Sequence, residues 1–156
     1  MSQMKNRSWI AAAAVVGAFA LLGGCSQMKS MMGGDESRGR AQNITLSGGN
    51  EVPPVTTPAT GSGTVSINAD RSVTARITVS GMTATAAHIH TGAAGANGPV
   101  VVPFVKSGDN VFVAPEGARM TEEQYAAYKA GNTYVNVHSA RNPGGEIRAQ
   151  LRAIDR

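Results

Sequence analysis

The stretch GTVSINADRSVTARITV, residues 63–79, holds two short segments rich in β-branched residues on either side of a polar turn. In both segments apolar residues occupy every second position: Val65 and Ile67 before the turn, and Val73, Ala75, Ile77 and Val79 after it. This period of 2 puts the apolar side chains on one face of each strand. Residues 68–71, which read Asn-Ala-Asp-Arg, have the composition of a hairpin turn. The stretch therefore predicts two antiparallel strands with one buried face.

Short runs of the same kind continue through the rest of the chain, separated by Gly, Pro, Asn, Asp and Ser. They lie at residues 43–46, 86–90, 100–104, 110–113, 133–138 and 146–151. With 19 Gly and 7 Pro, the chain is rich in turns. Many short strands with frequent turn signals predict an all-β fold, an antiparallel Ig-like, Greek-key β-sandwich over residues 42–154. The single cysteine excludes an intramolecular disulfide framework, and the low charged fraction of 15% excludes a charge-driven disordered chain.

One helix near residues 121–130 is expected to interrupt the strands. Thr121 and Gln124 have the spacing of a capping box, and two glutamates between them favour the first helical turn. Gly131 is placed to end the helix.

The N-terminal residues have the features of a secretory signal. Lys5 and Arg7 precede a short apolar run over residues 9–22, and the run ends in Leu-Leu-Gly-Gly-Cys at residues 21–25. That ending resembles a bacterial lipobox, which implies cleavage after residue 24 and lipidation of Cys25 with acyl chains such as palmitate.

We therefore expect residues 25–41 to be a flexible tether between a membrane anchor and the sandwich. Several acyl chains suffice for stable anchoring. The protein is expected in the bacterial cell envelope on the extracytoplasmic side, and Ser26 favours the outer membrane if the source is Gram-negative.

The formal net charge of +4 partly reflects this leader. Removing residues 1–24 takes away Lys5 and Arg7 and leaves +2. No basic cluster with interleaved aromatic residues remains, so nucleic acid is excluded as a partner.

The three histidines all occur at predicted strand positions. A period of 2 puts His88 and His90 on one face of their strand, with Ile89 on the other. In residues 133–138, Val135 and Val137 form the apolar face, so that His138 lies on the polar one. If the two strands are neighbours, three imidazoles converge on one point outside the core.

Three neutral imidazoles suit Cu(II) or Zn(II), and we expect copper in first place with zinc as the less favoured ion. Asn136, Glu146 and Arg148 are the candidates for an outer layer around the ligands, since a carboxylate or carbonyl that receives the second ring N–H fixes the imidazole tautomer. Two alternatives stay open. The histidines can form a polar network without a metal, and Glu146 and Arg148 can pair with each other on the surface.

Other kinds of site find little support in the sequence. No Gly-x-Ser-x-Gly elbow is present, and the ten acidic residues offer no facing pair of the glycosidase type. The glycine-rich loop at residues 91–99 lacks the Lys and Ser/Thr of a phosphate-binding loop. We interpret it as a structural loop that sets the approach to the histidines.

Several separated motifs resemble the chordin-type (CHRD) domain, in the right order and over residues 43–152. They are LSGGNEVPPV at 46–55, ATGSG at 59–63, AHIHTG at 87–92, NGPV at 97–100, YVNVHS at 134–139 and PGGEIRAQL at 143–151. The resemblance implies a β-rich extracellular module, found singly in many bacterial secreted proteins. Ala149 stands where the family usually carries glycine.

A fainter resemblance links His88, His90 and His138 to the copper ligands of copper/zinc superoxide dismutases. A bridging histidine, the zinc ligands and a cysteine pair are missing from the sequence, which weakens dismutase activity more than metal binding.

The expected function is a non-catalytic, copper-binding module on a membrane-anchored lipoprotein, and an enzyme is the less favoured interpretation. One alternative is a copper-dependent redox enzyme of the superoxide dismutase type. Another is an envelope scaffold or adhesion module with structural histidines, whose partner is an envelope protein or a polysaccharide.

Overall fold

The structure is a computed structural model, and it describes residue 39 and residues 41–152. The predicted signal segment 1–24, Cys25 and most of the predicted tether lie outside the described residues. Gly39, at the end of that tether, is hydrogen-bonded to the domain: its N–H donates to Asn68 Oδ1 at 2.7 Å, and its carbonyl accepts from Ser66 Oγ at 2.9 Å.

The described residues form nine strands, one α-helix and one 3-10 turn. In chain order they are β1 (Gln42–Ser47), η1 (Gly48–Asn50), β2 (Thr60–Ile67), β3 (Val73–Ser80), β4 (Ala84–Thr91), β5 (Val100–Pro103), β6 (Val105–Gly108), β7 (Val111–Val113), α1 (Glu122–Lys129), β8 (Thr133–Ser139) and β9 (Ile147–Gln150). The eight predicted runs all contain a strand. The ninth strand, β6, was not predicted, because all four of its side chains are exposed and it therefore lacks the alternation that marks a half-buried strand.

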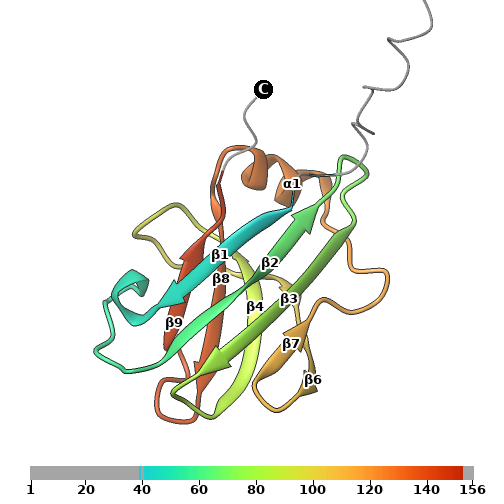
Figure 1. Cartoon of the computed structure of the whole chain (residues 1–156). Coiled ribbons are helices and arrows are strands. Elements are labelled where there is room, and N and C mark those ends of the chain that lie inside the picture. The colour runs from blue at the N-terminus through green and yellow to red at the C-terminus, as the bar shows by residue number, and fades with distance from the viewer. Residues whose placement is uncertain (1–38, 40, 153–156) are drawn as a thin grey trace, which may run out of the picture. The chain divides into compact units, whose positions relative to one another are not determined.

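All strand pairs are antiparallel and belong to one sheet of order β5-β4-β8-β9-β1-β2-β3-β7-β6. The sheet folds back on itself, so that β1, β2 and β3 lie in front of β4 and β8 (Figure 1). Its two edge strands, β5 and β6, are consecutive in the chain and are separated only by Phe104. The predicted all-β antiparallel fold is confirmed, and its two layers are parts of one nearly closed sheet.

The core lies between the two layers. As the alternation predicted, Val65, Ile67, Val73, Ile77 and Val79 are buried on one side. Buried residues of the opposite layer face them, namely Ile89, Val135, Val137, Ile147 and Ala149. Because successive side chains of a strand point to opposite faces, the residues that alternate with these, including the histidines, lie on the other face of the sheet.

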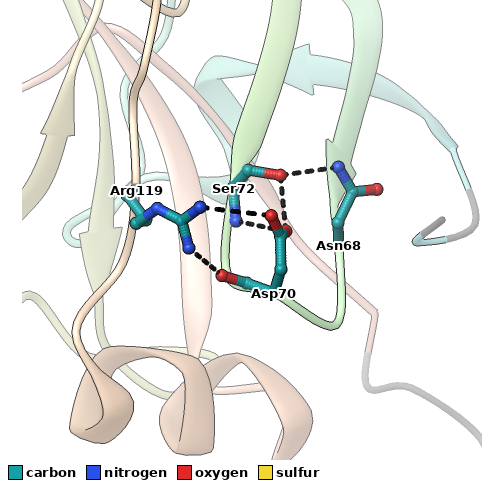
Figure 2. Close-up of polar contacts among 4 residues, drawn as sticks. All are labelled: Asn68, Asp70, Ser72 and Arg119. Carbon is teal, nitrogen blue, oxygen red and sulfur yellow. Dashed lines mark hydrogen bonds and ion pairs between the residues drawn. The ribbon is translucent and has the colours of Figure 1, made fainter. Parts of the chain in front are cut away.

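The hairpin predicted at residues 68–71 connects β2 and β3 (Figure 2). Arg71 adopts a left-handed φ of 72°, and its N–H donates to the carbonyl of Asn68 at 2.8 Å. The Asp70 carboxylate accepts from the N–H and hydroxyl of Ser72, and it forms an ion pair with Arg119 at 3.2 Å. These hydrogen bonds from Ser72 lower the pKa of Asp70. Because both partners of the ion pair are more than half exposed, solvent screens their attraction and we expect the pair to contribute little to stability.

The helix α1 begins and ends as predicted. Thr121 is its N-cap, and Thr121 and Gln124 form both hydrogen bonds of the capping box, at 3.2 and 2.8 Å. Gly131 follows the last turn with a φ of 76°. Tyr128 packs into the core, and its hydroxyl accepts from Gln42 Nε2 at 2.9 Å. Among the described residues, no helix is both long and apolar enough to cross a membrane.

Candidate metal centre

The three histidines meet on the outer face of β4 and β8, as predicted. The ring centroids of His88 and His138 are 4.8 Å apart, those of His88 and His90 are 5.4 Å apart, and those of His90 and His138 are 5.8 Å apart. One ligand atom from each ring lies within 4.8 Å of the other two.

The register of the two strands produces this convergence. β4 and β8 are antiparallel neighbours, with Ala86 opposite His138 and His88 opposite Asn136. His138 is therefore diagonal to His88 on the same face, at a separation that long side chains can bridge. Ile89 points into the core and is fully buried. The period-2 pattern on both strands accounts for the cluster.

Two backbone carbonyls fix the orientation of two of the rings. Nδ1 of His90 lies 3.0 Å from the carbonyl oxygen of Gly98, and Nδ1 of His138 lies 2.9 Å from that of Pro143. A carbonyl oxygen only accepts, so Nδ1 carries the proton in both rings. In the neutral rings, Nε2 of each is therefore unprotonated and carries a lone pair.

His88 completes the set through Nδ1, which lies 3.0 Å from Nε2 of His138. Since Nε2 of His138 holds a lone pair, the Nδ1–H of His88 is the donor of this hydrogen bond. Two nitrogens bound at about 2.0–2.1 Å to one ion are themselves about 3 Å apart. The separation of these two atoms thus suits a shared metal ion as well as a hydrogen bond.

The cluster lies outside the apolar core, yet it is sheltered from solvent. His90 is only 8% exposed, and its Nε2 is buried without a hydrogen-bond partner. Burial is the largest cause that lowers the pKa of all three histidines, and it combines with the neighbouring imidazoles to lower the pKa of His88 to about 4. The rings are therefore neutral at pH 7, which is the form that binds metal.

The predicted outer residues Asn136, Glu146 and Arg148 are all buried, and none of the hydrogen bonds described here joins them to an imidazole. Arg148 donates to the loop over residues 92–98, whose Gly98 carbonyl receives the ring N–H of His90. Glu146 accepts from Thr57 at 2.6 Å and from the hydroxyl of Ser139. The alternative that Glu146 and Arg148 pair on the surface is wrong, because both are buried against other partners.

A buried carboxylate, Glu51, was missed by the sequence reasoning. It is 5% exposed, and its two oxygens accept from Nδ2 of Asn136, each at 3.0 Å. Burial raises its pKa to about 7, against the opposing effects of the Arg148 charge and the Asn136 hydrogen bond. Its position in the family-like stretch of residues 46–55 was the available signal, but one turn residue among many gives no sign of burial.

The loop at residues 91–99, interpreted from its sequence as a structural loop, holds one of the histidine rings. Gly98 carries the carbonyl that orients His90, and the Gly98 N–H donates to the hydroxyl of Tyr134 at 3.2 Å. A side chain at Gly98 would collide with the carbonyl of Thr91, so only glycine fits this close approach.

A family model described as CHRD domain matches residues 43–151. Searches of curated proteins and of solved structures gave no match.

Proposed function

We propose a function for this chain, which belongs to the CHRD domain family. It is a non-catalytic metal-binding module of the cell envelope. Its ligands are Nδ1 of His88 and Nε2 of His90 and His138. The observation that carries the proposal is the close approach of the three imidazoles: one ligand atom of each lies within 4.8 Å of the other two, and backbone carbonyls hold two of the rings.

The donor set favours copper over zinc in our proposal. Three imidazole nitrogens suit both ions, and affinity for a site of this kind rises to a maximum at Cu(II) in the first-row series. The cluster offers three ligands, so a bound ion retains at least one position for water or a small ligand.

Anchoring through lipidated Cys25 belongs to the same proposal. It is supported by the basic and apolar segments before that cysteine and by the lipobox-like residues 21–25. A Cys25→Ser variant is expected to leave the membrane fraction. Retention of that variant in the membranes would contradict the anchor and leave the metal site unaffected.

The test of metal binding compares the purified full chain with a variant in which all three histidines are alanine. We expect the parent to bind about one equivalent of Cu(II) in the presence of a weak competing chelator, and the variant to bind none. Equal binding by both proteins would overturn the proposal, since it would assign the copper to other donors.

Because His90 is buried, His90→Phe provides a second variant that preserves the ring. His90 stacks on Tyr134 with centroids 5.0 Å apart and an interplanar angle of 9°, and phenylalanine keeps that contact while it removes both nitrogens. We expect this folded variant to bind Cu(II) at least tenfold more weakly.

A further inference from the structure

We propose that Arg148 is a positioning residue for the metal site, which acts by holding loop 92–98 so that the Gly98 carbonyl fixes the ring of His90. The inference rests on the proposed metal-binding function and deepens it. It concerns a residue that touches neither the imidazoles nor an ion bound by them.

Arg148 is 1% exposed, and most of its hydrogen bonds go to the loop; one more goes from Nη2 to Oε1 of Gln150 at 3.1 Å. Nη2 donates to the carbonyls of Ala93 at 3.2 Å and Ala96 at 2.9 Å, and Nη1 donates to Oδ1 of Asn97 at 3.2 Å. Three acceptors from one loop match the planar fork of arginine, whose donors point in fixed directions. A lysine ammonium is a point charge and cannot reproduce that geometry.

The loop depends on hydrogen bonds such as those from Arg148 because little of it is buried. Residues 93–97 are all exposed, so their positions depend on hydrogen bonds rather than on packing. Two of the acceptors of Arg148, on Ala96 and Asn97, directly precede Gly98, whose carbonyl receives Nδ1–H of His90 at 3.0 Å. A loop that moved at Ala96 and Asn97 would carry the Gly98 carbonyl away from the ring.

A second contact joins Arg148 to His90 through Tyr134. The guanidinium carbon lies 3.4 Å from the centroid of the Tyr134 ring, and His90 stacks on the same ring. Tyr134 is on β8, between β4 with His90 and β9 with Arg148, so its ring separates the two side chains. Arg148 thus holds the His90 ring from two directions: through the loop carbonyl, and through the stacked tyrosine.

The test uses Arg148→Lys, which keeps the positive charge and removes the fork. If Arg148 acts only through its positive charge, for example on Glu51, the His90 tautomer is expected to be the same in this variant as in the parent. The positioning role predicts that His90 no longer stays in the Nδ1–H form. Two-bond proton–nitrogen NMR of the metal-free full chain distinguishes the two tautomers directly.

We expect the parent to show His90 with Nδ1 protonated and Nε2 free, and Arg148→Lys to show a mixture of tautomers at His90. The His138 signal is expected to stay unchanged, because the Pro143 carbonyl holds it independently. Cu(II) affinity is expected to fall about 10- to 100-fold. Arg119→Lys, an exposed arginine in the β2–β3 turn cluster, is the matched control and is expected to change neither quantity.

Asn97→Ala keeps the inference testable should Arg148→Lys fail to fold. Asn97 is exposed, and its loss removes one acceptor of Arg148 together with a 2.7 Å hydrogen bond to the Val52 carbonyl. We expect a smaller shift of the His90 tautomer in the same direction. An unchanged His90 tautomer and a Cu(II) affinity within twofold of the parent, in whichever variant folds, would overturn the inference.

Failure of the proposed metal-binding function and failure of the inference about Arg148 give different results. Absence of copper binding by the parent chain overturns the proposed function, whereas a copper-binding Arg148→Lys protein with an intact His90 tautomer overturns only the role of Arg148.

Discussion

Nδ1 of His88 lies 3.0 Å from Nε2 of His138, and His88 is the donor because Nδ1–H of His138 is already engaged by the Pro143 carbonyl. In the metal-free chain the two rings are therefore linked by a proton that an ion must displace.

This relationship predicts a change of tautomer at one ring alone. When Zn(II), which is diamagnetic, binds the three nitrogens, the His88 proton moves from Nδ1 to Nε2, while His90 and His138 keep Nδ1–H. Proton–nitrogen NMR during a Zn(II) titration of the full chain checks this. Persistence of Nδ1–H on His88 at saturating Zn(II) would show that this atom is not a ligand.

The pH dependence of metal binding follows from the lowered pKa values of the histidines. From an ordinary imidazole pKa of about 6.5, the sequence predicts metal loss below that pH. Because burial lowers all three pKa values, and that of His88 to about 4, protons compete with the metal only at lower pH. We expect copper to stay bound at pH 6 and to be released toward pH 4. NMR titration of the metal-free chain measures the pKa values, and a His88 value near 6.5 would contradict this account.

Glu51 and the histidines are expected to change stability with pH in opposite directions. The histidines bind fewer protons folded than unfolded, so their contribution is present above about pH 6.5 and is lost as the pH falls. Glu51 has a folded pKa of about 7 against 4.5 when unfolded, so its contribution is present below pH 4.5 and is lost as the pH rises through 7.

Glu51→Gln separates these two effects. The free energy of unfolding of the parent relative to this variant is expected to fall by about 3 kcal/mol between pH 4 and pH 7.5, as the displacement of one pKa implies. Urea unfolding at several pH values measures it, with Glu116→Gln as the control for removal of an exposed carboxylate. A difference between parent and variant that does not change with pH would show that the pKa of Glu51 is not raised in the folded chain.

Gly145 supports the Glu51–Asn136 pair by lacking a side chain. Its φ is 134°, and an added Cβ would lie 2.7 Å from Asn136 Oδ1 and 2.9 Å from Glu51 Oε1. We expect Gly145→Ala to destabilise the fold by roughly 3 kcal/mol or more. Gly117 also has a positive φ, 73°, but a Cβ added there would meet no atom within 4 Å. Gly117→Ala is therefore expected to cost only about 1 kcal/mol. Thermal unfolding compares the two, and equal losses would show that the close contact at Gly145 has no effect.

The parts of the molecule that follow from local patterns could be predicted from the sequence. Period-2 alternation was sufficient to place His88 and His90 on one face and Val135 and Val137 on the other, and the capping box was sufficient to start the helix at Glu122. These features depend on neighbours in the chain, and the structure agrees with each of them.

The groups that complete the site could not be predicted because they depend on long-range contacts. The carbonyls of Gly98 and Pro143 are backbone atoms, which every residue has, so residue type gives no sign of their role. Arg148 was a candidate for the layer around the ligands, but its loop partners lie more than fifty residues away, in the loop after β4. The burial of Glu51 likewise depends on a loop that folds over the sheet.

The passage of the chain through Phe104, from β5 at one edge of the sheet to β6 at the other, has a consequence for proteolysis. After a single cut at this link, β5 would be held to the domain only through β4, and β6 only through β7. Fraying of either strand would expose the unpaired backbone groups of β4 or β7. Such edges act as templates for pairing with other chains. A nick at this one place is therefore expected to loosen both edges of the sheet at once and to promote aggregation.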